Sequence, residues 1–330
     1  MSTTPQFAVA VIGAGPGGIA AGVKLRKAGI DDFVILERAD DVGGSWHENH
    51  YPGLGVDIPT IAYQYSFARN ANWNRFFAKG AEVKQYHVDV ARKYGLYPRI
   101  RFNTNIEREE WDDTGSFWKL HAADGSVVTA RFLISAVGAF VRPKEDVGIA
   151  GAKSFKGKMQ RPTDWDHGYD MTGKAVGIIG TGASAVQIIP AIAPEVGHLT
   201  VFQRQPHWVA PRRRLSDEVP EHQRWLGTHL PFYANWTRLK SFWGTADNNY
   251  PVIIRDPEWA AEHLSISPAN DRLLQICQGY IDRTFGAGSE LARKVTPDFA
   301  PYGKRIIRDP GGYYAALTRS HVDVEAAEPL

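Results

Sequence analysis

Two glycine-rich turns are the parts of this sequence whose residue types and spacing could do chemistry. The first is Gly13-Ala14-Gly15-Pro16-Gly17-Gly18, and the second is Gly180-Thr181-Gly182-Ala183-Ser184-Ala185. In such turns the first glycine makes a tight bend, the second lets the backbone approach a pyrophosphate, and the third small residue lets helix and strand pack closely. The helix that follows offers its N–H groups to phosphate oxygens. Both turns therefore predict dinucleotide binding.

The residues expected to meet the ribose differ between the two turns. Glu37 follows the strand after the first turn, about 20 residues beyond Gly18, where a carboxylate accepts hydrogen bonds from ribose hydroxyls. The equivalent place after the second turn holds Arg204, with no acid beside it. A carboxylate would repel a 2′-phosphate, whereas arginine pairs with it. We interpret the first site as one for an adenine dinucleotide with free ribose hydroxyls and the second as one for NADP.

The elements that must position these turns follow from short apolar runs. Strands are expected at 7–12 and 33–36 around the first turn, and at 175–179 and 198–202 around the second. Helices are expected to follow each turn, and another over 81–94. The pattern predicts an α/β fold with two Rossmann-like dinucleotide-binding domains. We assign residues 1–141 to the first domain and 142–330 to the second, with a helical insertion at about 216–300.

Composition excludes several classes of function. The 330 residues carry a net charge of +2, which argues against nucleic acid or an acidic membrane as a partner. The single cysteine, Cys277, excludes a CxxC redox pair and suits a reducing, cytoplasmic location. His47 and His50 have no acidic or cysteine cluster to complete a metal site, so we expect no metal. Two dinucleotide sites instead predict electron transfer between two cofactors, with NADPH and FAD as the common pair.

Three further stretches resemble the Baeyer–Villiger monooxygenase family. The stretch 155–166 is similar to the family fingerprint F-x-G-x-x-x-H-x-x-x-W-P/D and matches it at Phe155, Gly157, Trp165 and Asp166. The stretch from Gly43-Gly44-Ser45-Trp46 through Tyr51-Pro52-Gly53 to Asp57 resembles the flavin-binding part of the family. The stretch Gly303-Lys304-Arg305, followed by Asp309-Pro310-Gly311-Gly312-Tyr313-Tyr314, resembles the part with its active-site Lys-Arg pair, in a form typical of the branch around 4-hydroxyacetophenone monooxygenase.

The resemblance implies an FAD- and NADPH-dependent monooxygenase acting on a small-molecule ketone. NADPH would reduce FAD, O₂ would give a C4a-peroxyflavin, and its attack on the ketone would yield an ester or lactone. Trp165 and Asp166 favour this reading over a related flavin monooxygenase that oxygenates nitrogen or sulfur. A catalytically impaired remnant is the remaining alternative.

The resemblance also implies roles for individual residues. Arg305 would stabilise the peroxide and the developing alkoxide, and Asp57 would orient it. Lys304 and Arg204 would hold the 2′-phosphate, with Thr181, Gly182 and Ser184 at the NADP pyrophosphate. Gly180 and Ala185 complete the second turn. The residues expected to contact FAD are Gly13, Gly15, Pro16, Gly18, Glu37, Gly44, Ser45, Trp46, Asp57, Tyr63 and Ile106.

The sequence departs from the family in two respects. Arg161 stands where the fingerprint has histidine, and arginine is always charged and only donates hydrogen bonds. Histidine would both donate and accept, and could change its charge near neutral pH. Family members also continue beyond the position of Leu330, so we expect the second domain to lack its C-terminal end.

Overall fold

The structure, a computed structural model, describes residues 4–140, 143, 148–211, 218–309 and 311–326. Its internal contacts divide the chain into one unit of residues 1–50 and 80–165 and a second of residues 51–79 and 166–330. The predicted boundary between domains, at 141 and 142, lies outside the described residues, as does the predicted start of the insertion at 216. The assignment of the two domains therefore stays a prediction.

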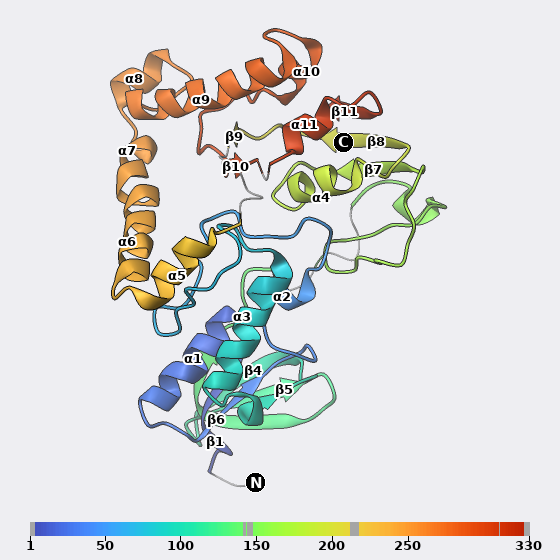
Figure 1. Ribbon diagram of the computed structural model, residues 1–330. Helices are drawn as coiled ribbons and strands as arrows, with labels where there is room; N and C mark the ends of the chain where they lie inside the picture. The colour runs from blue at the N-terminus through green and yellow to red at the C-terminus, as the bar shows by residue number, and fades with distance from the viewer. Residues whose placement is uncertain (1–3, 141–142, 144–147, 212–217, 310, 327–330) are drawn as a thin grey trace. The chain divides into compact units, whose positions relative to one another are not determined.

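The first unit is built on a six-stranded sheet (Figure 1). In pairing order its strands are β3 (Ile100–Arg101), β2 (Phe33–Leu36), β1 (Phe7–Ile12), β6 (Val127–Ser135), β5 (Phe117–Ala122) and β4 (Ile106–Asp112). β1 is parallel to β2 and β6, and β2 to β3, whereas β4, β5 and β6 are antiparallel neighbours. The central strands β1 and β2 are wholly apolar and mostly buried, as parallel strands covered on both faces usually are.

The described residues of this unit form the α-helices α1 (Pro16–Lys27), α2 (Ser45–Glu48) and α3 (Gly80–Lys93). Helices α1 and α3 contact each other, and α2 contacts α3. The strands expected at 7–12 and 33–36 and the helices expected after the first turn and near 81–94 are confirmed.

The first glycine turn joins β1 to α1 by direct backbone contact. Gly13 has a φ of +96°, and a Cβ there would lie 2.6 Å from the Ala136 carbonyl oxygen. A Cβ on Gly18 would lie 1.8 Å from the Gly13 carbonyl oxygen. At Gly17 the nearest atom to an added Cβ is the Cβ of Ala136, at an ordinary 3.6 Å. Positions 13 and 18 therefore require glycine, because a side chain there would clash with the backbone, whereas position 17 does not.

The second unit has a parallel three-stranded sheet in the order β11-β8-β7 (Figure 1). These strands are β7 (Ala175–Ile179), β8 (His198–Gln203) and β11 (Val322–Ala326), and α4 (Ala185–Ile192) lies between β7 and β8 in the chain. The predicted strands around the second turn are thus confirmed. With the parallel strands β3, β2, β1 and β6 of the first unit, they establish the α/β, Rossmann-type class.

The chain between β8 and β11 is mainly helical. Its helices are α5 (Glu221–His229), α6 (Tyr233–Thr245), α7 (Tyr250–Ile253), α8 (Pro257–Glu262), α9 (Pro268–Phe285), α10 (Glu290–Val295) and α11 (Tyr313–Leu317). Helix α9 begins at the N-cap Ser267, whose hydroxyl accepts from the Asn270 amide at 3.2 Å. Cys277 is fully buried on α9, and burial raises its thiol pKa to about 12, so this cysteine packs rather than reacts.

A short parallel pair, β9 (Val209–Ala210) with β10 (Ile307–Arg308), brings the chain after β8 beside the chain before α11. Asp309 follows β10 and is buried, with 2% of its surface exposed. Its Oδ1 accepts from the amides of Gly311 and Gly312 at 2.8 Å and of Tyr313 at 3.0 Å. Its Oδ2 accepts from the Tyr314 amide at 3.2 Å and from the Tyr280 hydroxyl of α9 at 2.7 Å. One carboxylate therefore joins β10, α11 and α9.

None of the helices in the described part of the chain combines the length and the apolar character that crossing a bilayer requires.

Alanine at two adjacent glycines should have opposite outcomes. We expect Gly18→Ala to destabilise the chain by about 3 kcal/mol, because the new methyl group would overlap the Gly13 carbonyl. Gly17→Ala lies in α1 with room for a methyl group, so its effect should be neutral or stabilising by up to about 1 kcal/mol. Urea unfolding followed by circular dichroism measures both; equal unfolding midpoints would refute the packing argument.

Asp309→Asn should destabilise the second unit by about 2 kcal/mol. The amide nitrogen that replaces Oδ2 would face the N–H of Tyr314, so a buried donor would lose its acceptor. Tyr280→Phe removes only the hydroxyl that donates to Oδ2 and should cost about 1 kcal/mol. Chemical denaturation of the two variants measures their free energies of unfolding. An Asp309→Asn protein as stable as the wild type would contradict the proposal that this carboxylate joins β10, α11 and α9.

Candidate functional site

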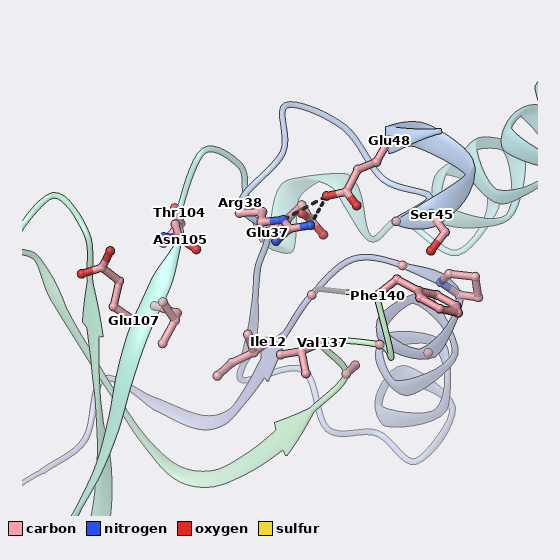
Figure 2. Close-up of a pocket in the computed structure, with 18 residues that line it drawn as sticks. Ile12, Glu37, Arg38, Ser45, Glu48, Thr104, Asn105, Glu107, Val137 and Phe140 are labelled. Carbon is pink, nitrogen blue, oxygen red and sulfur yellow. Dashed lines mark hydrogen bonds and ion pairs between the residues drawn. The ribbon is translucent and has the colours of Figure 1, made fainter. Parts of the chain in front are cut away.

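A cavity of about 650 Å³ opens in the first unit, where β1, β2 and β6 end (Figure 2). Ile12 at the end of β1, Glu37 after β2, and the stretch 136–138 after β6 all line it. The predicted cofactor-binding residues that line this cavity are Gly13, Gly15, Pro16, Glu37, Gly44, Ser45 and Ile106. The carboxyl ends of parallel strands are where dinucleotides bind in this fold class.

Two glycine loops form one wall of the cavity. An added Cβ on Gly44, whose φ is +53°, would lie 2.9 Å from the Cα of Gly15. The amide of Gly43 donates to the Ala14 carbonyl at 3.0 Å and ties the loops together. A side chain at Gly44 would push the loops apart, whereas a Cβ on Gly15 would meet the Cα of Gly44 at an ordinary 3.5 Å. Larger side chains at either position would fill the space beside α1 that a pyrophosphate needs.

Glu37 is held at the cavity by backbone donors. Its side chain is buried, and Oε2 accepts from the Ala14 amide at 2.5 Å while Oε1 accepts from the Ala39 amide at 2.9 Å. A carboxylate has about four lone-pair directions, so two remain for a ligand. The geometry suits a residue that accepts hydrogen bonds from ribose hydroxyls.

Sequence reasoning missed part of the cavity lining. Arg38 and Glu48 form an ion pair at the wall, drawn in Figure 2 beside Glu37. Thr104, Asn105 and Glu107 line the cavity around Ile106, and Val137, Gly138 and Phe140 line it after β6. Two of these groups could have been predicted from their positions in the sequence. Arg38 directly follows Glu37, and the stretch 136–138 follows a parallel strand, where dinucleotides bind in this fold class.

Other predicted flavin contacts do not line this cavity. Trp46 is half-buried on α2, and Gly18 packs α1 against the turn. Tyr63 and Asp57 belong to the segment 51–79 of the second unit. Their roles toward a cofactor stay predictions.

The second turn is more open than the first. Gly180 has a φ of +99°, and an added Cβ at Gly180 or Gly182 would meet no atom within 4 Å. Thr181 is buried, Ser184 precedes α4, and Ala185 begins it. These residues leave the N-terminus of α4 accessible for an anion.

One predicted cation directly follows β8, and a second contacts the residue next to it. Arg204 is exposed directly beyond β8, and Lys304 donates through Nζ to Oε1 of its neighbour Gln205. Lys304 also lies 5.2 Å from the ring centre of Phe299. The β9–β10 pairing explains this proximity, because it aligns the two chain segments. The arrangement suits joint binding of a phosphate.

Arg305 and Asp57 form an ion pair between Nη2 and Oδ2. The Arg305 side chain is 62% exposed and that of Asp57 35% exposed, so the guanidinium retains donors for a ligand. The structure therefore brings together the two residues predicted to be catalytic, although their catalytic roles stay predictions.

A small cavity of about 10 Å³ lies beneath the second turn, next to Thr181, His207 and Tyr314. Within the described residues, Nδ1 of His207 and the hydroxyl of Tyr314 are buried without a hydrogen-bond partner. Burial lowers the pKa of His207, so its ring favours the neutral form. Neither residue was singled out from the sequence, since an isolated histidine or tyrosine carries no motif.

The fingerprint residues lie at the division of the chain into units, which falls between Trp165 and Asp166. Phe155 is exposed, and its ring occupies the space where a Cβ on Gly157 would be, 2.5 Å away. Arg161 is half-buried and pairs with Asp164 in a short antiparallel bridge. The consequence of arginine at this position stays a prediction.

No group of three or more His, Cys, Asp and Glu side chains within the described ranges could hold a metal ion.

Known proteins resemble the chain over nearly its whole length. It is 37% identical to an uncharacterized monooxygenase of Sinorhizobium fredii, over 98% of this chain and 49% of that protein. It is 38% identical to a Baeyer-Villiger monooxygenase of Streptomyces coelicolor, over 97% of this chain and 58% of that protein. A crystal structure of OTEMO in complex with FAD and NADP superimposes with a TM-score of 0.79 at 28% identity, over 98% of this chain and 66% of that one.

These comparisons confirm the predicted relationship to Baeyer–Villiger monooxygenases. The chain spans between about half and two thirds of the length of these relatives. Residues 10–224 match the family described as pyridine nucleotide-disulphide oxidoreductase. This match covers more than half of the chain, which therefore belongs to the pyridine nucleotide-disulphide oxidoreductase family.

Proposed function

We propose that the chain is an FAD- and NADPH-dependent monooxygenase of the Baeyer–Villiger type, which uses O₂ to convert a small-molecule ketone to an ester or lactone. The observation that carries this proposal is the Asp57–Arg305 ion pair, one residue from Lys304 and in the same unit as the second dinucleotide turn. The family's disulfide chemistry does not apply, because the sequence has one cysteine and so no dithiol pair. The predicted cytoplasmic location remains part of the proposal.

The cavity of about 650 Å³ in the first unit fits the adenosine and pyrophosphate end of FAD. The glycines at positions 15 and 44 leave space that side chains would fill, and Glu37 supplies a fixed acceptor for ribose hydroxyls. FAD, when bound, supplies the route for electrons from NADPH to O₂. The chain's part is to bind and orient that cofactor through the two glycine loops.

The second turn fits NADPH rather than NADH. Thr181, Gly182 and Ser184 precede α4, whose N-terminal N–H groups suit a pyrophosphate. Arg204 and Lys304 put two positive charges at the end of β8, where an acidic residue would repel a 2′-phosphate. This charge arrangement supports selection of the phosphorylated cofactor.

Arg305 supplies the fixed positive charge that ketone oxygenation needs. Negative charge develops on the attacking oxygen and then on the former carbonyl oxygen, and a preorganised cation stabilises both. Asp57 holds the guanidinium in one direction through a single oxygen, which leaves the remaining N–H donors for the reacting groups.

A substitution at Glu37 tests FAD binding. Glu37→Gln should weaken FAD affinity by at least about tenfold, since a charge-assisted acceptor becomes a neutral amide. Glu109→Gln is the matched control, because Glu109 is an exposed glutamate of β4 that does not line the cavity. Titration of the purified proteins with FAD, followed by flavin fluorescence, measures both. A colourless wild-type protein that takes up no FAD would contradict the cofactor assignment.

A substitution at Arg305 tests the role of this side chain in ketone oxygenation. Arg305→Ala should leave anaerobic bleaching of FAD by NADPH within about twofold of wild type and lower ester formation at least about 100-fold. Arg308→Ala removes an exposed arginine from the same segment and serves as control. Stopped-flow absorbance and mass spectrometry of products, with a ketone and a thioether offered together, separate the steps.

Ester formation by Arg305→Ala would overturn the role of Arg305. Sulfoxide without ester from the wild-type protein would favour the alternative that oxygenates nitrogen or sulfur. An FAD-loaded wild type that NADPH does not bleach would indicate the impaired remnant.

A further inference from the structure

Gln187 of α4 holds the backbone of the segment that carries Asp57. Its Nε2 donates to the Gly55 carbonyl at 3.0 Å, and its Oε1 accepts from the Gly55 amide at 3.4 Å. The same Oε1 accepts from the Tyr51 hydroxyl at 3.0 Å. One side-chain amide thus pairs with both backbone groups of Gly55, two residues before Asp57.

This contact is buried and closely packed. The exposed fraction is 8% for Gln187 and 7% for Tyr51. Gly53 has a φ of +84°, and a Cβ there would lie 2.3 Å from the backbone carbonyl oxygen of Gln187. The segment can therefore lie directly on α4 only because position 53 is glycine.

The same contact reaches the second dinucleotide turn. Tyr51 interacts with the hydroxyl of Ser184 as well as with Gln187. Ser184 is the residue directly before α4 and one of those that we place at the NADP pyrophosphate. On the other side, Asp57 pairs with Arg305. The turn is therefore linked to the Arg305 guanidinium through Tyr51, Gln187, the backbone from Gly55 to Asp57 and one ion pair.

We propose that Gln187 and Tyr51 are positioning residues that fix Asp57, and through it Arg305, relative to the second dinucleotide turn. This inference rests on the proposed function, because it concerns the geometry of a reaction between a nicotinamide dinucleotide, a flavin and a ketone. Neither residue touches the reacting atoms. Both residues act by fixing the position of the Asp57–Arg305 ion pair.

The requirement at position 187 is for an amide. Glutamine donates and accepts, as the two groups of Gly55 demand. Leucine at this position would leave the Gly55 carbonyl and the Tyr51 hydroxyl without their buried partner. Glutamate could still accept from Tyr51, but its oxygens cannot donate to the Gly55 carbonyl. If Gln187→Leu does not fold, the more conservative variants Gln187→Glu and Tyr51→Phe can be used instead, because each removes only part of the contact.

The first arm of the test needs no cofactor and no activity. Hydrogen exchange of peptides covering residues 51–58, followed by mass spectrometry, should be on the order of tenfold faster in Gln187→Leu and several-fold faster in Gln187→Glu than in wild type. Gln203→Leu is the matched control: Gln203 is also buried in the second unit, but its amide donates to the Lys294 carbonyl at 2.5 Å. It should leave 51–58 unchanged. Unchanged exchange in both Gln187 variants would overturn the proposal.

The second arm measures the FAD-loaded protein. Gln187→Leu should change the dissociation constant for NADPH less than about threefold while the yield of ester per NADPH oxidised falls about tenfold. In the Arg305→Ala background the same substitution should have no further effect on ester yield, since the residue it positions is gone. Equal, additive losses in both backgrounds would refute a role through Arg305.

The two arms separate this inference from the proposed function. A wild-type protein that forms no ester contradicts the proposed function, and the exchange experiment then still decides whether Gln187 fixes the segment. Faster exchange with an undiminished ester yield per NADPH would show a structural contact only, and would overturn the positioning role.

Discussion

Close contact between backbone segments is the constraint on which the first unit depends. The Gly13 carbonyl lies where a Cβ of Gly18 would be, and the Gly15 and Gly44 loops approach each other in the same way. Each contact excludes side chains from the end of β1. The cavity beside α1, with the buried carboxylate of Glu37 at its wall, exists because these positions carry no Cβ. Polar backbone groups are therefore accessible at a place where side chains would otherwise close the fold.

The two turns share a backbone pattern and differ in charge. Glu37 lies buried among backbone donors, whereas Arg204 is exposed directly after β8 and Lys304 is half-buried beside Gln205. Burial suits a carboxylate that accepts hydrogen bonds from neutral hydroxyls, because the protein itself supplies its remaining donors. Exposure suits an arginine that meets a phosphate, since its guanidinium stays hydrated until the ligand arrives. The placement of each charge thus agrees with the ligand group that its sign would select.

The strands and helices around both turns were predictable, because period, length and glycine position coincide there. The pairing of Asp57 with Arg305 came from family resemblance, and no local pattern would have produced it, since 248 positions separate the two residues. Gln187, His207 and the buried, hydrogen-bonded carboxylate of Asp309 were not predicted from the sequence as functional or organising groups. Gln187 contacts Gly55 from 132 positions away, and Tyr280 donates to Asp309 from 29 positions away. Such long-range contacts leave no periodic trace in a sequence.

The energetics of the Asp57–Arg305 pair favour a functional over a structural explanation. An ion pair as exposed as this one contributes about 0–1 kcal/mol to stability, because water screens the charges and both side chains lose freedom. Yet buried hydrogen bonds through Gln187, a required glycine at 53, and the β9–β10 pairing all constrain the segments that carry it. These contacts fix the segments around an ion pair that itself adds little stability. A role of the guanidinium in binding a ligand would explain why its position is fixed. A cation that is already oriented costs no reorganisation when negative charge develops beside it, and its effect grows as a bound cofactor and substrate exclude water.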